Sequence, residues 1–177
     1  MPRLFTGLEL PDAVAGQLAL ARGGVVGARW IEPEDYHITL RFIGDVDGAA
    51  ARDIAETLGD ISRPLVPVRF EGLSSFGGAK PRAIVASVKA ERALTGLQAE
   101  QERRLRRIGL KPETRKFLPH VTLARLRGAG APAVADYLAL RGALIGESFM
   151  AERFVLYSAR DGSGGGPYVV EAAYPLG

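Results

Sequence analysis

The phrase His-x-Thr-Leu occurs twice in this chain, as HITL at residues 37–40 and as HVTL at residues 120–123. The chain has only two histidines, and both stand in this phrase. With 6 Thr and 21 Leu among 177 residues, independent placement would put Thr and Leu after both histidines with a probability of roughly 2 in 100,000. The repetition therefore predicts a chain built from two related halves.

The order of the expected elements also repeats. Alternating apolar residues, helical spacing and Gly or Pro stops predict strands over residues 3–10, 37–44, 65–78, 82–89, 119–128, 152–160 and 167–176. Helices are expected from Asp12 to Gly23 and over residues 47–60, 91–110 and 131–140, with a turn at DGSGGGP, residues 161–167. The 83 residues that separate the histidines also separate Leu73 from Leu156 and Ser75 from Ser158, although similarity outside the two phrases is faint.

Composition limits the class of protein. With 47% apolar and 24% charged residues, the chain is typical of a folded globular domain. No apolar run is long enough to cross a bilayer and the N-terminus does not resemble a signal peptide, so we expect a cytoplasmic protein. The absence of cysteine excludes disulfides, thiolate nucleophiles and cysteine zinc sites. A net charge of +3 permits an anionic partner without requiring one.

Each phrase has two faces if it forms a strand. Residues i and i+2 of a strand project from one face, and residues i+1 and i+3 project from the other. The aliphatic residues of each phrase can therefore anchor the strand on a core, while its His and Thr face a cleft between two lobes. The predicted cleft receives His37 and Thr39 from one lobe and His120 and Thr122 from the other.

Two imidazoles in one site can divide general acid and general base catalysis. Cleavage of a phosphodiester needs both, because the attacking oxygen loses a proton and the leaving oxygen gains one. Threonine hydroxyls can donate hydrogen bonds to the non-bridging phosphate oxygens. This chemistry requires neither a metal nor another cofactor. A single histidine in a strand is more often structural, and a single threonine often reflects only β-propensity. The catalytic interpretation therefore depends on the repetition of His and Thr at the same spacing.

Basic residues flank the second phrase: Arg115 and Lys116 before it, and Arg125 and Arg127 after it. Arg41 lies two residues beyond the first His-Thr pair, and strict alternation predicts that it lines the cleft. The same alternation aims Arg125 away from the cleft unless the strand bends. Solvated surface charge is the alternative reading of the four flanking residues.

Two aromatic residues are candidate stacking surfaces for a nucleobase, Tyr36 and Phe76. The alternative for Phe76 is packing beneath the Gly-rich loop around it. The DGSGGGP segment is not expected to bind phosphate, because it lacks the Lys-Ser/Thr ending of a phosphate-binding loop.

Nearly the whole chain resembles the two-histidine phosphoesterases, and specifically the RNA 2′,3′-cyclic phosphodiesterases long called 2′-5′ RNA ligases in bacteria and archaea. The segments that carry the resemblance are RLFTGLELP, RWIEPEDYHITLRFIGDV, FGGAKPRAIVASV, FLPHVTLARL and LYSARDGSGGGPYVV. It implies a single α+β domain over residues 1–177, made of two intertwined lobes, with two antiparallel sheets facing a central cleft and helices outside.

The resemblance also implies an activity and roles for individual residues. The expected reaction is metal-independent hydrolysis of a terminal 2′,3′-cyclic phosphate, on RNA or a nucleotide, to a 2′-phosphomonoester. We expect the protein to be a monomer and to have no membrane partner. His37 would donate a proton to the leaving 3′-oxygen, and His120 would activate water. Thr39 and Thr122, together with Arg125, would hold the phosphate. Many relatives carry a basic residue where this chain has Leu118, so no phosphate contact is expected there.

Two other functions fit the same residues. A 2′-5′ RNA ligase or transferase would run the reaction backwards, with a hydroxyl in place of water. A noncatalytic module that binds RNA ends would keep the basic cleft and lose little when either histidine is replaced.

Overall fold

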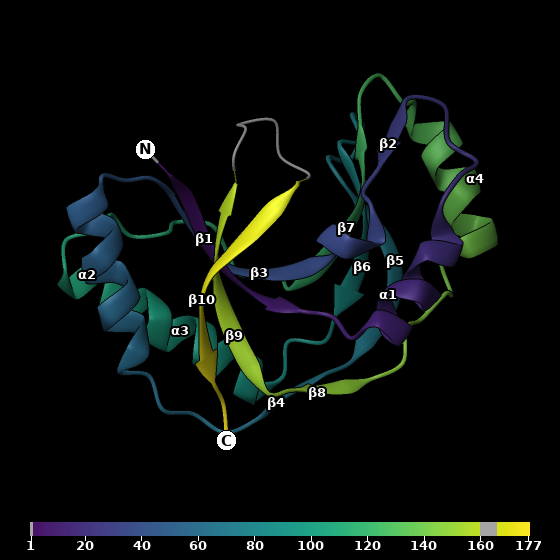
Figure 1. Cartoon of the computed structure of the whole chain (residues 1–177). Helices are drawn as coiled ribbons and strands as arrows, with labels where there is room; N and C mark the ends of the chain where they lie inside the picture. The colour runs from purple at the N-terminus through teal and green to yellow at the C-terminus, as the bar shows by residue number, and fades with distance from the viewer. Residues whose placement is uncertain (1, 160–165) are drawn as a thin grey trace.

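The computed structural model describes residues 2–159 and 166–177, and within these ranges the chain forms an α+β fold with four α-helices (Figure 1). The helices are α1 (Asp12–Leu18), α2 (Gly48–Gly59), α3 (Arg92–Arg107) and α4 (Ala131–Arg141). The strands are β1 (Arg3–Glu9), β2 (Ala28–Trp30), β3 (His37–Asp45), β4 (Val66–Val68), β5 (Phe70–Phe76), β6 (Ala83–Val88), β7 (His120–Leu126), β8 (Phe149–Ala151), β9 (Arg153–Ala159) and β10 (Tyr168–Pro175). Two 3₁₀ turns are η1 (Ala19–Ala21) and η2 (Pro33–Asp35).

Most expected elements are confirmed, and the differences involve short segments. The strand expected over residues 65–78 is divided into β4 and β5, and the first helix gives way to a 3₁₀ turn at Ala19. The strands β2 and β8 were not predicted, because three residues are too few to show a period-2 pattern. Residues 160–165, which include most of the expected DGSGGGP turn, lie outside the described residues.

Eight described strands form one antiparallel sheet in which β10, β9, β1, β3, β7, β6 and β5 follow one another and β2 pairs with β7. The two antiparallel sheets that the resemblance implies are thus the two halves of one hydrogen-bonded sheet. The strands β3 and β7 lie next to each other near the centre. They pair with each other through one pair of residues, Ile38 and Val121, which joins the two halves of the sheet. The strands β4 and β8 form a separate two-stranded sheet.

The elements recur at the spacing of the two histidines. The starts of β3 and β7, of α2 and α4, of β4 and β8, and of β5 and β9 are each separated by 83 residues. In the sheet, β1 and β9 follow outward from β3, while β6 and β5 follow outward from β7. The repeated phrase is thus one part of a repeated order of elements.

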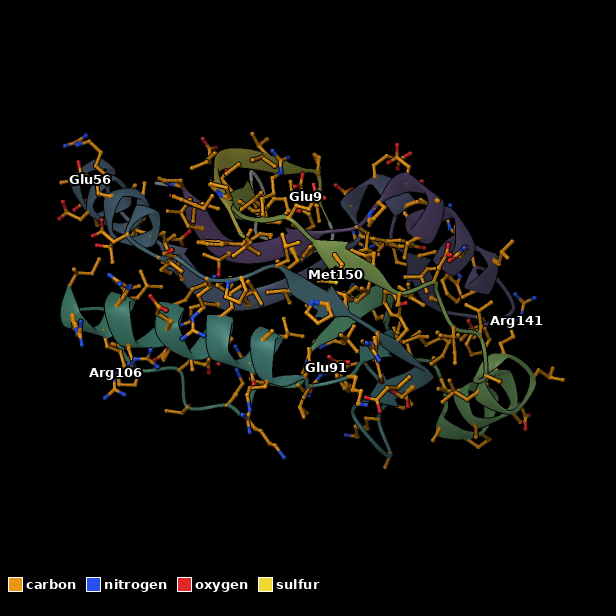
Figure 2. The ribbon with its side chains drawn as sticks, turned by 90° about the horizontal axis from the view of Figure 1, so that it is seen from below. Glu9, Glu56, Glu91, Arg106, Arg141 and Met150 are labelled. Carbon is orange, nitrogen blue, oxygen red and sulfur yellow. The ribbon has the colours of Figure 1, made fainter. Side chains whose placement is uncertain are left out.

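The apolar residues of both phrases are buried, as the alternation predicted. Ile38, Leu40, Val121 and Leu123 are at most 3% exposed and belong to the main hydrophobic core. In Figure 1, α2 and α3 lie beside one half of the sheet, and α1 and α4 lie beside the other half. Figure 2 shows the molecule from below, with Glu91 and Arg106 near the two ends of α3 and Met150 of β8 between the helices. None of the described helices is long and apolar enough to cross a membrane.

A buried ion pair ties the central strand β3 to helix α3. The Nε atom of Arg41 donates to the carboxylate of Glu102 over 2.5 Å, and the two side chains are only 6% and 16% exposed. Glu102 also accepts from the backbone amide of Glu113, and Arg41 donates to the carbonyl of Lys111. The pair therefore fixes the loop between α3 and β7 as well.

We predict that Glu102→Ala lowers the free energy of unfolding by about 3 kcal/mol, because it leaves the buried guanidinium of Arg41 without its counter-charge. Denaturant unfolding measures this loss. The matched control is Asp45→Ala, which breaks the exposed pair between Arg3 and Asp45 and should cost under about 1 kcal/mol. Equal losses in the two variants would contradict the interpretation of the buried pair.

Candidate active site

The four polar residues of the two phrases lie together on one face of the central sheet. Ile38 and Val121 pair across the junction of β3 and β7, and their side chains point into the core. The residues on either side of each must then project to the opposite face. We call this surface the histidine face, and its central residues are His37, Thr39, His120 and Thr122.

Both imidazoles are held by the same local hydrogen bond. The Nδ1 atom of His37 donates to the carbonyl of Asp35 over 2.8 Å, and that of His120 donates to the carbonyl of Leu118 over 2.6 Å. A carbonyl only accepts, so Nδ1 carries the proton and Nε2 of the neutral ring keeps a lone pair. The hydroxyl of Thr39 lies 3.0 Å from Nε2 of His37 and can donate to it.

The surroundings of both histidines disfavour the charged imidazolium. Burial lowers the pKa of His37 to about 4, and the nearby His120 and Arg125 add to this effect. Burial also lowers the pKa of His120, again with a contribution from the guanidinium of Arg125. Both rings are therefore neutral at pH 7 in the unliganded protein, and Arg125 lies close enough to act on both.

A β-bulge changes the direction of side chains in β3. Gly7 of β1 pairs with Thr39 of β3. The preceding residue of β1, Thr6, pairs with Arg41, so one residue of β3 is skipped. Leu40 is the extra residue, and both Leu40 and Arg41 are buried. Beyond the bulge the alternation is shifted by one residue. Arg41 therefore points into the core, and the prediction that it lines the cleft is wrong.

The same bulge occurs at the equivalent position of β7. Val85 of β6 pairs with Thr122, and Ile84 pairs with Ala124, so that Leu123 is the extra residue. The shift turns Arg125 onto the histidine face, where strict alternation would not place it. The structure thus brings Arg125 to the histidines, and its effect on the pKa of both rings agrees with this position.

Aromatic side chains surround His37, and sequence reasoning did not identify them. The ring of His37 has centroid distances of 5.0 Å to Phe5, 5.4 Å to Tyr157 and 4.9 Å to Tyr168. These residues come from β1, β9 and β10, whose order in the sheet is not visible in the sequence. A Cβ atom on Gly7 would lie 2.8 Å from the backbone oxygen of Ile38 and 3.1 Å from the ring of Tyr157, so glycine is needed for this close packing.

The remaining candidates from the sequence lie in different surroundings. Phe76 packs edge-on against the ring of His120, with centroids 4.7 Å apart. Tyr36 is 3% exposed within the main core, so it offers no ring face to a base, and that prediction is wrong. Arg115 lies in the loop before β7, where its hydrogen bond to Glu113 lowers the pKa of that carboxyl to about 2. A role for Arg115 stays a prediction.

A pocket of about 210 Å³ lies beside the histidine face rather than at its centre. It shares Tyr157 and Tyr168 with the aromatic surroundings of His37, and it is lined by the carboxylates of Glu9, Asp12, Glu34 and Asp35. Carboxylates repel an anion, so this pocket does not suit a phosphate. Over residues 2–159 and 166–177, no group of three or more His, Asp or Glu side chains could hold a metal ion.

Residues 8–86 and 85–168 each match the sequence pattern of the LigT like Phosphoesterase family. The chain belongs to this family. The two matches cover the two repeats separately, so each half of the chain carries the family pattern.

Individual relatives agree with this assignment. A protein of Aeropyrum pernix named RNA 2′,3′-cyclic phosphodiesterase is 37% identical over 122 residues, which is 66% of this chain and 69% of that protein. A Bacillus subtilis protein of the same name is 28% identical over 162 residues, or 88% and 87% of the two chains. Among solved structures, TT0787 of Thermus thermophilus matches with a TM-score of 0.84 at 24% identity, covering 98% of this chain and 97% of that one. Escherichia coli LigT complexed with 3′-AMP matches with a TM-score of 0.79 at 22% identity, covering 99% of both chains. These two structures support the fold.

The depressed pKa of His37 predicts a pH dependence of stability. Its folded-state pKa of about 4 lies below the ordinary 6.5, so the unfolded chain binds a proton first as the pH falls. The wild-type free energy of unfolding should therefore decrease between pH 6.5 and 4 by up to about 3 kcal/mol more than that of His37→Gln, which cannot titrate. Denaturant unfolding across this range measures the difference, and parallel curves would show that burial does not disfavour the charged ring.

Proposed function

We propose that this phosphoesterase hydrolyses the terminal 2′,3′-cyclic phosphate of RNA to a 2′-phosphomonoester. One observation carries the proposal: two imidazoles on one sheet face have Nδ1 fixed to a carbonyl, and a threonine follows each of them on that face. The names of the Aeropyrum pernix and Bacillus subtilis relatives support this choice of substrate.

The proposed mechanism uses the two free ring nitrogens. Nε2 of His120 takes a proton from water, whose oxygen attacks phosphorus. The bond from phosphorus to the 3′-oxygen breaks, and Nε2 of His37 gives that oxygen a proton. The hydroxyls of Thr39 and Thr122 and the guanidinium of Arg125 hold the non-bridging oxygens, where negative charge increases in the transition state. Both proton transfers are thus assigned to imidazoles, without a metal or another cofactor.

The role of His37 as the acid needs a bound anion. Its pKa of about 4 leaves the ring neutral at pH 7 in the unliganded protein. A negative charge within hydrogen-bond reach favours the imidazolium, so a bound cyclic phosphate raises the pKa of His37. Once substrate is bound, the raised pKa of His37 allows its Nε2 atom to carry the proton that the leaving oxygen receives. The division of roles between the two histidines follows the resemblance to two-histidine phosphoesterases.

We further propose that the chain is one domain made of two intertwined lobes, each centred on one phrase, with the substrate between them. The recurrence of elements at 83-residue spacing supports this arrangement, as do the two matches to the family pattern. In this arrangement each lobe supplies one His-Thr pair, so neither lobe alone contains a complete site.

We predict that the wild-type protein opens the cyclic end of RNA in EDTA and that His37→Gln and His120→Gln each lose a factor of about 10² to 10⁴ in rate. Chromatography of the RNA ends measures this, and it should show a 2′-phosphate rather than a 3′-phosphate. Glu56→Gln, an exposed change on α2, is the control and should keep full activity. Full activity in either histidine variant would contradict the mechanism. Binding without turnover in the wild type would instead support the noncatalytic module.

We also predict a bell-shaped dependence of kcat on pH, because kcat reports the ionisation of the two histidines in the enzyme–substrate complex. The rate falls at low pH because protonation of His120 removes the base, and at high pH because deprotonation of His37 removes the acid. The two limbs belong to the pair rather than to either residue alone, since His120 lowers the pKa of His37. Initial rates at saturating concentrations of a cyclic-ended dinucleotide between pH 4 and 9 measure the profile. A flat profile from pH 5 to 9 would contradict paired histidine catalysis.

A further inference from the structure

A pair of serine hydroxyls lies on the histidine face beside His120, on the neighbouring strands β5 and β6 (Figure 1). Ser87 of β6 is paired with His120 of β7. Ser74 of β5 is paired with Val85 of β6, which is paired with Thr122. Paired residues project from the same face of a sheet, so both serines share the face of the histidine and the threonine. The two Oγ atoms are 2.9 Å apart, and both side chains are half-buried.

The serine pair can form further hydrogen bonds. Two hydroxyls that bond to each other use only one of their two protons, so a second proton and several lone pairs are left. Within residues 2–159 and 166–177, the side chains of Ser74 and Ser87 make no other hydrogen bond to the protein. The pair is therefore placed to bind water or another polar group on the histidine face.

The Nε2 atoms of the two histidines are engaged differently. The hydroxyl of Thr39 lies 3.0 Å from Nε2 of His37 and can donate to it. Nε2 of His120 has no hydrogen-bond partner in the described part of the chain, since the ring is held only through Nδ1. A neutral ring with its proton on Nδ1 presents a lone pair at Nε2. At His120 this lone pair is available to accept a proton from water.

The residues opposite the two histidines in the sheet also differ. Glu9 of β1 is paired with His37, and its carboxylate is bound by Arg153 through two hydrogen bonds of 2.7 and 2.9 Å. The ring of His37 is further surrounded by the three aromatic side chains described above, and apolar rings do not hold water. His120 instead has the hydroxyl of Ser87 opposite it. Water is thus favoured at His120 and disfavoured at His37.

A water molecule between Ser87 and His120 can be held by two acceptors. The Cβ atoms of directly paired residues are about 4.5–5.5 Å apart, so one water can bridge their side chains. One proton of this water points at Nε2 of His120. The other points at the Oγ atom of Ser87, whose own proton is donated to Ser74. The water oxygen then keeps a lone pair for the attack on phosphorus.

We propose that the serine pair positions the attacking water and thereby makes the protein a hydrolase rather than a transferase. This inference rests on the proposed function. An alcohol has a single hydroxyl proton, which His120 takes, so none is left for Ser87. Water therefore makes one more hydrogen bond than an alcohol in this position, which corresponds to a preference of about fivefold. Ser87 is a positioning residue in this account, because it acts through the water.

Competition between water and methanol for a cyclic-ended dinucleotide tests this proposal on the whole protein. Water gives the 2′-phosphomonoester and methanol gives its methyl ester. In both reactions the bond from phosphorus to the 3′-oxygen breaks, His120 takes the proton of the nucleophile, and His37 protonates the leaving oxygen. At a fixed methanol concentration, Ser87→Ala should lower the initial ratio of monoester to methyl ester about fivefold. Ser74→Ala should lower it too, because Ser87 then loses the acceptor that directs its proton.

Ser75→Ala is the matched control. Ser75 follows Ser74 in β5, and its partner Ile84 is buried in the main core, so its side chain projects from the opposite face. This variant should keep the wild-type product ratio and rate. The ratio does not depend on the amount of folded protein, so a loss of stability in Ser87→Ala cannot imitate the expected change.

The kinetic constants give a second readout. Ser87→Ala should lower kcat for hydrolysis about fivefold and leave KM for the dinucleotide unchanged, because the pair contacts the nucleophile rather than the RNA. The same product ratio in the wild type and Ser87→Ala, or a rise in KM without a fall in kcat, would overturn the proposal. Failure of the proposed function has a different signature, namely that the wild type opens the cyclic phosphate with neither nucleophile.

Discussion

The pairing of Ile38 with Val121 is the contact on which the arrangement of the site depends. It is the single residue pair that joins β3 to β7, and both side chains are fully buried. Because these two residues face the core, the residues on either side must face away from it. One hydrophobic contact thereby places two histidines and two threonines on the same face. The residues are 83 positions apart in the sequence and equivalent in the two repeats, so the centre of the site lies where the repeats meet.

The two bulges show how far the sequence could predict the site. The repeated phrase was sufficient to predict two strands, the burial of their aliphatic residues and the shared face of each His-Thr pair. Strict alternation then gave the wrong face for Arg41, because a bulge one residue earlier shifts the pattern. For Arg125 the same alternation predicted a direction away from the cleft unless the strand bends, and the equivalent bulge turns it onto the histidine face. A bulge depends on pairing with a neighbouring strand, so the residues of one strand do not reveal it.

Contacts between segments that lie far apart in the chain also could not be predicted from the sequence. Phe5, Tyr157 and Tyr168 meet at His37 only because β10, β9, β1 and β3 are neighbours in the sheet. Single residues near a phrase were misjudged for a similar reason, as with Tyr36, which packs in the core. Periodicity predicted the elements well, and the order of strands decided which side chains meet.

The central claim is that the two phrases form one phosphate site, and a crystal structure with adenosine 2′-phosphate tests it most directly. The account predicts the phosphate between Nε2 of His37 and Nε2 of His120, within hydrogen-bond distance of both threonine hydroxyls. A phosphate bound by only one His-Thr pair, or in the carboxylate-lined pocket beside Tyr168, would contradict it.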